Sequence, residues 1–193
     1  MREISTRDCI VAQADTLFYE RGFEATSFAD IAATLGISRG NFYHHFKSKD
    51  DILNAVIAIR IERTRALLEG WQVATDSPRQ RILSFIRMLI GNRAKIMAFG
   101  CPVGTLCSEL AKLDHAAQAR AADIFGLFRD WLSAQFQALG AGDGSEALAL
   151  HLLSWSQGVA VMATAFRDEA FIHREVADIE HWLTTVPDLS QSR

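Results

Sequence analysis

The 193-residue sequence has little cysteine, little proline and no long apolar run. Its three cysteines, Cys9, Cys101 and Cys107, are too few and too unevenly spaced for a disulfide framework. No run of 18 or more apolar residues occurs, and the first residues lack the apolar core of a signal peptide. We therefore expect no membrane span and a protein of the reducing cytoplasm.

The sequence also lacks an excess of basic residues. The formal net charge is −3 and the pI is near 6.1, so any site for nucleic acid must be local. One such stretch exists, because no acidic residue lies between Asp30 and Asp50. That stretch contains three cations and two histidines: Arg39, Lys47, Lys49, His44 and His45.

Apolar residues recur at helical spacing along most of the chain, whereas strand-like alternation is hard to find. The pattern predicts an all-α fold of about nine helices. Serine caps, glycine stops and Pro78 indicate where the helices begin and end. We expect three short helices within residues 5–47 and further helices at about 49–71, 78–99, 105–113, 115–139, 145–167 and 169–185.

Residues 27–46, SFADIAATLGISRGNFYHHF, have the pattern of two short helices joined by a tight turn that contains Gly36. The apolar residues of this segment, with those of the preceding helix, suffice for a small core. The second helix would then present its polar side to solvent. A helix of about eight residues on a small rigid support is the size that the major groove of DNA admits.

The outward residues of this second helix have the chemistry of DNA recognition. Arg39 can read guanine or bind phosphate, and Asn41 can read adenine. Tyr43 and His44 can donate to phosphate. Gly40 near the helix start costs about 1 kcal/mol relative to alanine, a cost that makes sense if a DNA backbone comes close. The alternative is an ordinary helical corner with a solvated face.

The string GFEATSFADIAATLGISRGNFYHHFKSKDDIL resembles the signature of the TetR family of transcription regulators. The resemblance implies a helix-turn-helix DNA-binding domain at residues 1–48 and a larger ligand-binding and dimerisation domain at 49–187. From the sequence after Pro187 we expect a disordered tail at 188–193. The family often has threonine or serine at position 41, where this sequence has asparagine. This departure concerns the base preference and not the docking mode. The DNA contacts carried over from the family are Ser27, Ser38, Arg39, Gly40, Asn41, Tyr43, His44 and Lys49.

The helix expected at 145–167 is apolar on two sides and therefore needs two packing partners. The family resemblance implies that the last two helices of each subunit form a four-helix dimer interface. A central helix buried in a monomer is the alternative. We assign to the interface Leu152, Trp155, Val159, Ala160, Ala163, Ile179 and Leu183.

The middle helices are rich in phenylalanine, and we expect them to enclose an apolar ligand pocket. The alternative is that these side chains simply fill the core. No phosphate loop, metal-ligand spacing or nucleophile elbow occurs, so we expect no cofactor and no metal. The candidate pocket residues are Phe85, Leu89, Phe99, Phe125, Phe128 and Cys101.

The string from Gly100 to Leu110, GCPVGTLCSEL, weakly resembles that of electrophile-sensing repressors of the N-ethylmaleimide reductase type. A thiol at a helix start can be activated by the helix dipole. Cys101 is therefore a candidate sensor, with Cys107 second, and a small residue packed beside a turn is the alternative.

These observations predict a dimeric repressor, not an enzyme, that binds a pseudo-palindromic DNA operator and leaves it when a small apolar or electrophilic effector binds. One alternative is a helical enzyme with Cys101 as nucleophile and His115 as base, although no orienting group or oxyanion hole can be named. Another is an architectural DNA-binding protein, which would not need a large apolar second domain.

Overall fold

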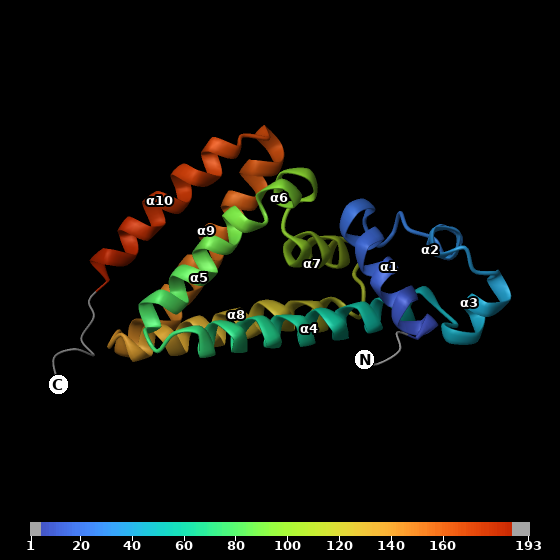
Figure 1. Ribbon diagram of the computed structural model, residues 1–193, viewed down its shortest axis with the longest axis horizontal. Coiled ribbons are helices and arrows are strands. Elements are labelled where there is room, and N and C mark those ends of the chain that lie inside the picture. The colour runs from blue at the N-terminus through green and yellow to red at the C-terminus, as the bar shows by residue number, and fades with distance from the viewer. Residues whose placement is uncertain (1–4, 187–193) are drawn as a thin grey trace. The chain divides into compact units, whose positions relative to one another are not determined.

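The structure, a computed structural model, describes residues 5–186, and within them the side chain of every residue except Arg39. The described residues contain no strand, which confirms the all-helical fold (Figure 1). The elements are α1 (Thr6–Arg21), α2 (Phe28–Leu35), α3 (Arg39–His45), α4 (Lys49–Ala74), α5 (Pro78–Gly91), α6 (Arg93–Phe99), α7 (Pro102–Lys112), α8 (Gln118–Ala138), η1 (Gly142–Gly144), α9 (Ser145–Phe166) and α10 (Glu169–Thr185).

One helix expected from the sequence is two in the structure. The segment 78–99 breaks at Asn92, which separates α5 from α6. Both the backbone N–H and the side-chain amide of Asn92 donate to the carbonyl of Met88, each at 3.0 Å. Asparagine competes in this way with the regular helix ladder, and the apolar spacing that continues across Asn92 concealed the break. The described residues therefore contain ten α-helices rather than about nine.

The chain divides into two compact units, of which the first comprises residues 1–63 and 103–123 and the second comprises 64–102 and 124–193. The first unit thus includes α7, which the sequence assigned to the second domain. The boundary expected at residue 48 separates two functional domains, and it stays a prediction. The expected disordered tail, 188–193, lies outside the described residues.

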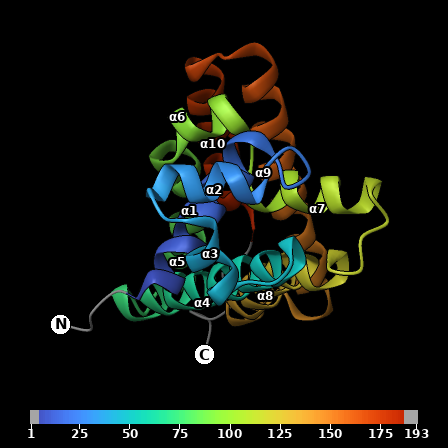
Figure 2. The same cartoon turned by 90° about the vertical axis from the view of Figure 1, so that its right-hand side faces the viewer.

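The core of the first unit is built from side chains of α1, α2, α3, the first part of α4, α7 and the start of α8. Figure 2 shows α1, α2 and α3 from their own side. Ile10, Ile31 and Phe42 are almost completely buried, one from each of the first three helices. Leu106 and Leu110 bring one side of α7 into the same core. The small three-helix unit is therefore completed by a helix that lies far along the chain.

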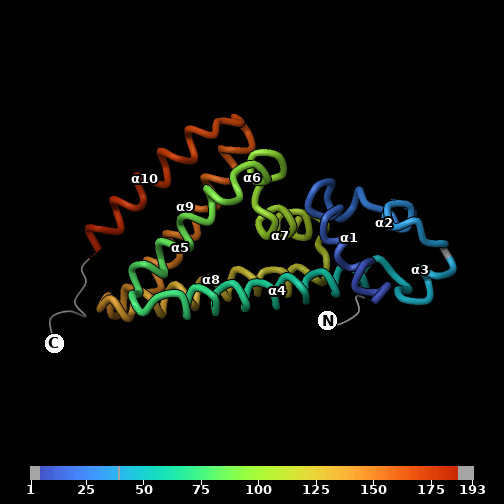
Figure 3. Tube along the Cα trace, in the orientation of Figure 1, coloured from blue at the N-terminus to red at the C-terminus, as the bar shows by residue number. Residues whose placement is uncertain are grey.

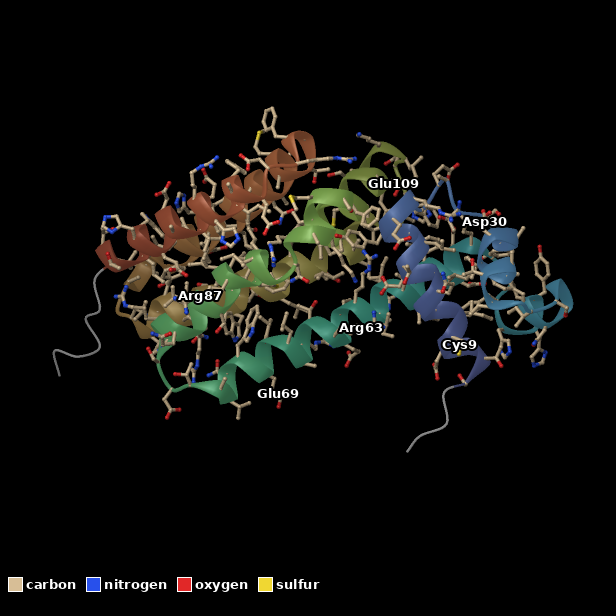
Figure 4. All side chains as sticks on the ribbon, turned by 45° about the horizontal axis from the view of Figure 1, so that its top comes forward. Cys9, Asp30, Arg63, Glu69, Arg87 and Glu109 are labelled. Atoms are coloured by element: carbon tan, nitrogen blue, oxygen red, sulfur yellow. The ribbon has the colours of Figure 1, made fainter. Side chains whose placement is uncertain are left out.

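An ion-pair cluster fixes α1 against α4 within the first unit. The Asp15 carboxylate accepts from Arg60 Nε at 2.6 Å through one oxygen and from Arg63 Nη1 at 2.6 Å through the other. Arg60 is buried, and Arg63 lies on the exposed side of α4 (Figure 4). Because a buried charge without its partner is costly, the cluster fixes the relative position of the two helices.

In the second unit, α10 packs along α5 and α9 packs against α6, and Figure 3 traces the chain through them. Arg79 donates to the carbonyls of Leu183 and Val186 at the end of α10, and Thr164 Oγ1 donates to the carbonyl of Ile96 at 2.8 Å. An exposed ion pair joins Arg87 to the α10 residue Glu180 at 2.6 Å. These bonds reinforce an apolar core that all four helices share.

Among the described residues, one helix, Gly142–Phe166, is long and apolar enough to cross a membrane. No membrane span is expected from the sequence, because it contains no run of 18 or more apolar residues. The test is weak evidence for a membrane span because core helices of soluble proteins also pass it. Here one side of α9 is buried against other helices of its own unit.

Candidate nucleic-acid interface

The helix α3 is held in place by its two ends and by its buried side. Gly36 ends α2 in the left-handed conformation, with φ of 65°, which glycine adopts without a Cβ penalty. Ser38 begins α3, and its Oγ accepts from the backbone N–H of Asn41 at 3.3 Å. Phe42 and, just after the helix, Phe46 are buried in the core. The opposite side of α3 is therefore left to solvent.

The side of α3 away from the core carries most of the residues expected to bind DNA. Gly40, Asn41, Tyr43 and His44 are exposed, as is the cap Ser38. The Tyr43 ring is held edge-on by Phe28, with 5.5 Å between ring centroids. The side chain of Arg39 lies outside the described residues, so its expected base contact stays a prediction.

Gly40 has no structural reason to be glycine within the chain. A Cβ atom added at this position would meet no heavy atom within 4 Å, and no left-handed φ requires glycine there. Alanine would make α3 more stable by about 1 kcal/mol. The open space beside Gly40 would allow close approach of a binding partner.

Ser27 begins α2 in a complete capping box with Asp30. The Ser27 hydroxyl and backbone N–H both donate to Asp30 Oδ2, at 2.5 and 2.8 Å, and the Asp30 N–H donates back to Ser27 Oγ at 3.2 Å. The hydrogen bonds from Ser27 lower the pKa of Asp30 below its usual value. Both Ser27 donors are thus engaged, so a phosphate contact from Ser27 requires them to leave Asp30.

Lys49 differs most from the expectation. Its ammonium group lies 4.4 Å from the centroid of the Phe23 ring, donates to the Glu24 carbonyl at 3.1 Å, and lies 3.7 Å from the Glu24 carboxylate. These interactions tie the start of α4 to the segment between α1 and α2. These interactions give Lys49 a structural role, and its expected phosphate contact stays a prediction.

Another cation lies nearer to α3. Lys47 is exposed, and its ammonium donates to the backbone carbonyl of Tyr43, four residues earlier at the end of α3. A cation at a helix C-terminus is stabilised by the helix dipole. The four-residue spacing of Tyr43 and Lys47 is the sequence signal for this contact, although from the sequence Lys47 was expected only to belong to the basic stretch.

Sequence reasoning missed the role of Glu109. Its two carboxylate oxygens accept from the backbone N–H groups of Phe23 and Glu24, each at 2.9 Å. Gly22 precedes them with φ of 96°, and a Cβ atom there would lie 3.0 Å from Glu109 Oε1. Figure 4 shows Glu109 on α7 beside the end of α1. The carboxylate thus fixes the turn that leads from α1 into α2.

His115, just after α7, uses both ring nitrogens inside the first unit. Its Nδ1 accepts from the Ala117 N–H at 3.1 Å, and its Nε2 lies 3.3 Å from Asp50 Oδ1. Its ring packs edge-on against Phe23 at 5.3 Å. These contacts give His115 a structural role rather than that of the general base considered above.

The residues assigned to the dimer interface lie mainly in the chain's own core. Six are buried and Trp155 is partly buried, because α5, α6 and α10 of the same unit cover that side of α9. The buried six are Leu152, Val159, Ala160, Ala163, Ile179 and Leu183. The exposed side of α9 instead carries other apolar residues: Leu150, Val161, Met162 and Phe166, 44–74% exposed.

The candidate pocket residues all belong to the second unit. Phe85 and Phe128 are buried and meet edge-on, with 5.6 Å between ring centroids, as core-filling side chains do. Leu89 is also buried, whereas Phe99 and Cys101 are partly buried. Phe125 is partly buried too. The structure therefore brings Phe85 and Phe128 into direct contact. Ligand binding by the six residues stays a prediction.

Comparison with known proteins gives two family matches. Residues 10–56 match the model described as bacterial regulatory proteins, tetR family. Residues 78–177 match the model described as the C-terminal domain of LmrA/YxaF-like transcriptional regulators. The second match covers more than half of the chain.

Individual proteins agree with the family matches. The chain is 28% identical over 137 residues, 70% of each protein, to an uncharacterized HTH-type transcriptional regulator of Lactococcus lactis subsp. lactis. It is 45% identical over 53 residues, 28% of this chain and 26% of the relative, to the HTH-type transcriptional repressor KstR2 of Mycolicibacterium smegmatis. A TetR transcriptional regulator from Legionella pneumophila superimposes with a TM-score of 0.83 at 26% identity, covering 96% of this chain and 98% of the other.

Proposed function

The chain belongs to the TetR family and is a DNA-binding transcription regulator, and we propose that it acts as a dimeric repressor released from its operator by a small molecule. The observation that carries the proposal is the exposed side of α3. It presents Asn41, Tyr43 and His44 around a glycine that the chain itself does not require. Polar groups and a close-approach position on one short, rigidly capped helix are what the major groove accepts.

In this proposal the side chains of α3 divide between base reading and phosphate binding. Arg39 and Asn41 read bases, because their side chains match the donors and acceptors of guanine and adenine. Tyr43, His44 and Ser38 bind phosphates. Lys47 is added to this group as an exposed cation at the end of α3.

We propose that the exposed side of α9 forms the interface between two copies of the chain. Its exposed residues include the apolar Val161 and Met162 and the small Ser154, Gly158 and Ala165. A Cβ atom at Gly158 would meet nothing within 4 Å, so close approach by a partner helix is possible there. A second copy would remove this apolar surface from water, which favours association.

Two copies of α3 would then contact two half-sites of a pseudo-palindromic operator. The half-site centres would lie roughly 34–36 Å apart, or a multiple of that distance, so that both face the same side of the DNA. An effector that binds the second domain must favour a different arrangement of the two recognition helices to release the operator. We place this cycle in the cytoplasm, without a cofactor and without a catalytic step.

The test is a gel shift with the DNA upstream of the protein's own gene, at several salt concentrations and with candidate effectors. Arg39→Ala and Asn41→Ala should each reduce discrimination between the operator and base-substituted operators, by about 1–3 kcal/mol at the base concerned. Tyr43→Phe should weaken binding to all sequences alike. If the double variant of Arg39 and Asn41 kept full operator affinity and specificity, α3 would not be the recognition helix.

A further inference from the structure

The second unit contains an unsatisfied hydrogen-bond donor. Trp131, on α8, is partly buried, but its indole nitrogen Nε1 is fully covered. Among the side chains that the structure describes, this nitrogen is the one buried nitrogen or oxygen without a hydrogen-bond partner. A buried tryptophan N–H normally has an acceptor, so an unpaired one needs an explanation.

Aromatic side chains lie beside Trp131 and one turn earlier on α8. The Trp131 ring lies 5.5 Å from that of Trp71 on α4, measured between centroids. One turn earlier on α8, Phe128 meets Phe85 of α5. Both tryptophan rings are partly accessible to solvent. Aromatic faces of this kind favour stacking or edge contacts with another unsaturated ring.

One turn further along α8, Gln135 contacts Arg81 of α5, whose guanidinium can donate to an oxygen atom of a ligand. Gln135 is buried, and its Oε1 accepts from Arg81 Nη1 at 3.3 Å. The Arg81 guanidinium otherwise donates to the backbone carbonyls of Thr75 at 2.8 Å and Gln72 at 3.0 Å. Over the described part of the chain, the partners of this cation are therefore neutral. A guanidinium without a carboxylate partner attracts a polar, oxygen-bearing ligand.

We propose that the second unit binds a flat unsaturated molecule whose carbonyl oxygen accepts the N–H of Trp131 and whose ring lies against Trp71. This inference rests on the proposed function and names the chemical class of its effector. Since Nε1 is covered, an acceptor reaches it only after neighbouring groups move. Binding therefore favours an arrangement of the second unit other than the present one, as a ligand that controls a protein must.

The competing explanation is an internal water molecule that accepts from Nε1. Such a water would satisfy the donor without any ligand, and the protein would then show no preference for a carbonyl. A matched pair of ligands separates the two explanations. The first is 2-acetylnaphthalene, and the second is 2-isopropenylnaphthalene, which has the same shape but carries a CH₂ group in place of the carbonyl oxygen.

The experiment is isothermal titration calorimetry of both ligands with the full-length protein and its Trp131→Phe and Trp182→Phe variants. Trp131→Phe keeps an aromatic ring and removes the N–H donor. Trp182 lies on α10, where its ring contacts His151 and Phe136, so Trp182→Phe is the matched control. The wild type and the control should bind the ketone about three- to tenfold more tightly than the hydrocarbon, the effect of one hydrogen bond, and Trp131→Phe should bind both equally.

Equal affinity for both ligands in the wild type, no binding of either, or an unchanged preference in Trp131→Phe would overturn the inference. Should Trp131→Phe fail to fold, the indole N–H signals of the ¹⁵N-labelled wild type decide. The Trp131 signal, assigned by removing Trp71, Trp155 and Trp182 in turn, should move further with the ketone than with the hydrocarbon. Operator binding without ligand is measured separately, so that its failure would contradict the proposed function while calorimetry still decides the ligand site.

Discussion

Glu109 Oε2 accepts the backbone N–H of Phe23 at 2.9 Å across 86 residues of sequence. The contact joins α7 to the turn between α1 and α2, and the other oxygen of the same carboxylate binds the next N–H along the chain. The turn leads directly into the capping box that begins α2, and α2 supports α3. The position of the DNA-binding surface therefore depends on a side chain from a helix that sequence alone assigns to the other domain.

The first prediction concerns the charge of Glu109. Glu109→Gln retains the length of the side chain but leaves one oxygen where two accept now, and it turns an NH₂ group toward a backbone donor. We expect a loss of about 1–3 kcal/mol in the free energy of unfolding and weaker binding to the operator. Urea denaturation and gel shift measure the two effects.

Glu69→Gln provides the control, because Glu69 is exposed on α4 (Figure 4). It makes the same change in charge elsewhere on the surface, where substitutions usually have small effects. Equal stability and operator affinity in the two variants would show that the Glu109 contact does not hold the turn.

The second prediction separates stability from DNA binding at Gly40. Gly40→Ala should raise the free energy of unfolding by about 0.5–1 kcal/mol, because alanine restricts the unfolded chain and meets no neighbour in the folded one. The same methyl group should weaken operator binding by about fivefold or more, the effect of one lost contact. Thermal denaturation and gel shift on the same preparation test both signs.

Gly70→Ala is the matched control for Gly40→Ala. Gly70 also lies within a helix, and a Cβ atom there also meets nothing within 4 Å. We expect it to stabilise the protein without changing operator affinity. A Gly40 variant that bound the operator as well as the Gly70 variant would remove the argument for close approach at α3.

The third prediction concerns the interface between copies. Val161 is 61% exposed on α9, and Val161→Glu should leave the single chain folded. Dimerisation would then bury an unpaired carboxylate, which costs roughly 3–5 kcal/mol. We expect monomers in sedimentation velocity and loss of operator binding. Val73→Glu makes the same substitution at a residue of α4 that is 79% exposed, and it should remain dimeric.

Ala163→Glu should behave differently from Val161→Glu. Ala163 is completely buried within the chain, so the charge would be forced into the core of a single subunit. Loss of the folded state, seen by circular dichroism, is the expected result for Ala163. A folded, dimeric Val161→Glu protein would exclude this side of α9 from the interface.

Interactions between residues close in sequence could be predicted from the sequence. The capping box of Ser27 and Asp30 spans three residues, and its spacing predicts the start of α2 correctly. The two apolar stripes of α9 are also visible in the sequence. Helical periodicity gives their number but not which of them the chain itself covers. The structure buries the stripe with Ala160 and Ala163 within the chain.

Long-range contacts of polar groups could not be predicted. From sequence alone Lys49 is one cation in a basic stretch, and only the fold brings its ammonium group against Phe23 and Glu24. Glu109 is likewise one acid on a predicted helix until Phe23 is placed beside it. Both contacts depend on how α1, α4 and α7 pack, which periodicity within each helix does not determine.

The last prediction concerns Cys101, which is partly buried and directly precedes α7, between Gly100 at the end of α6 and Pro102. Addition of N-ethylmaleimide to its thiol would form a thioether and place a bulky ring in this tight turn. Because α7 carries Glu109, a displaced start of α7 would disturb the contacts that position α2.

The wild type and the Cys107→Ser variant should release the operator after treatment, and Cys101→Ser should retain it. Mass spectrometry identifies the modified thiol, and gel shift measures release. Equal release by all three proteins, or none by the wild type, would return Cys101 to a packing role and leave a non-covalent ligand of the second unit as the effector.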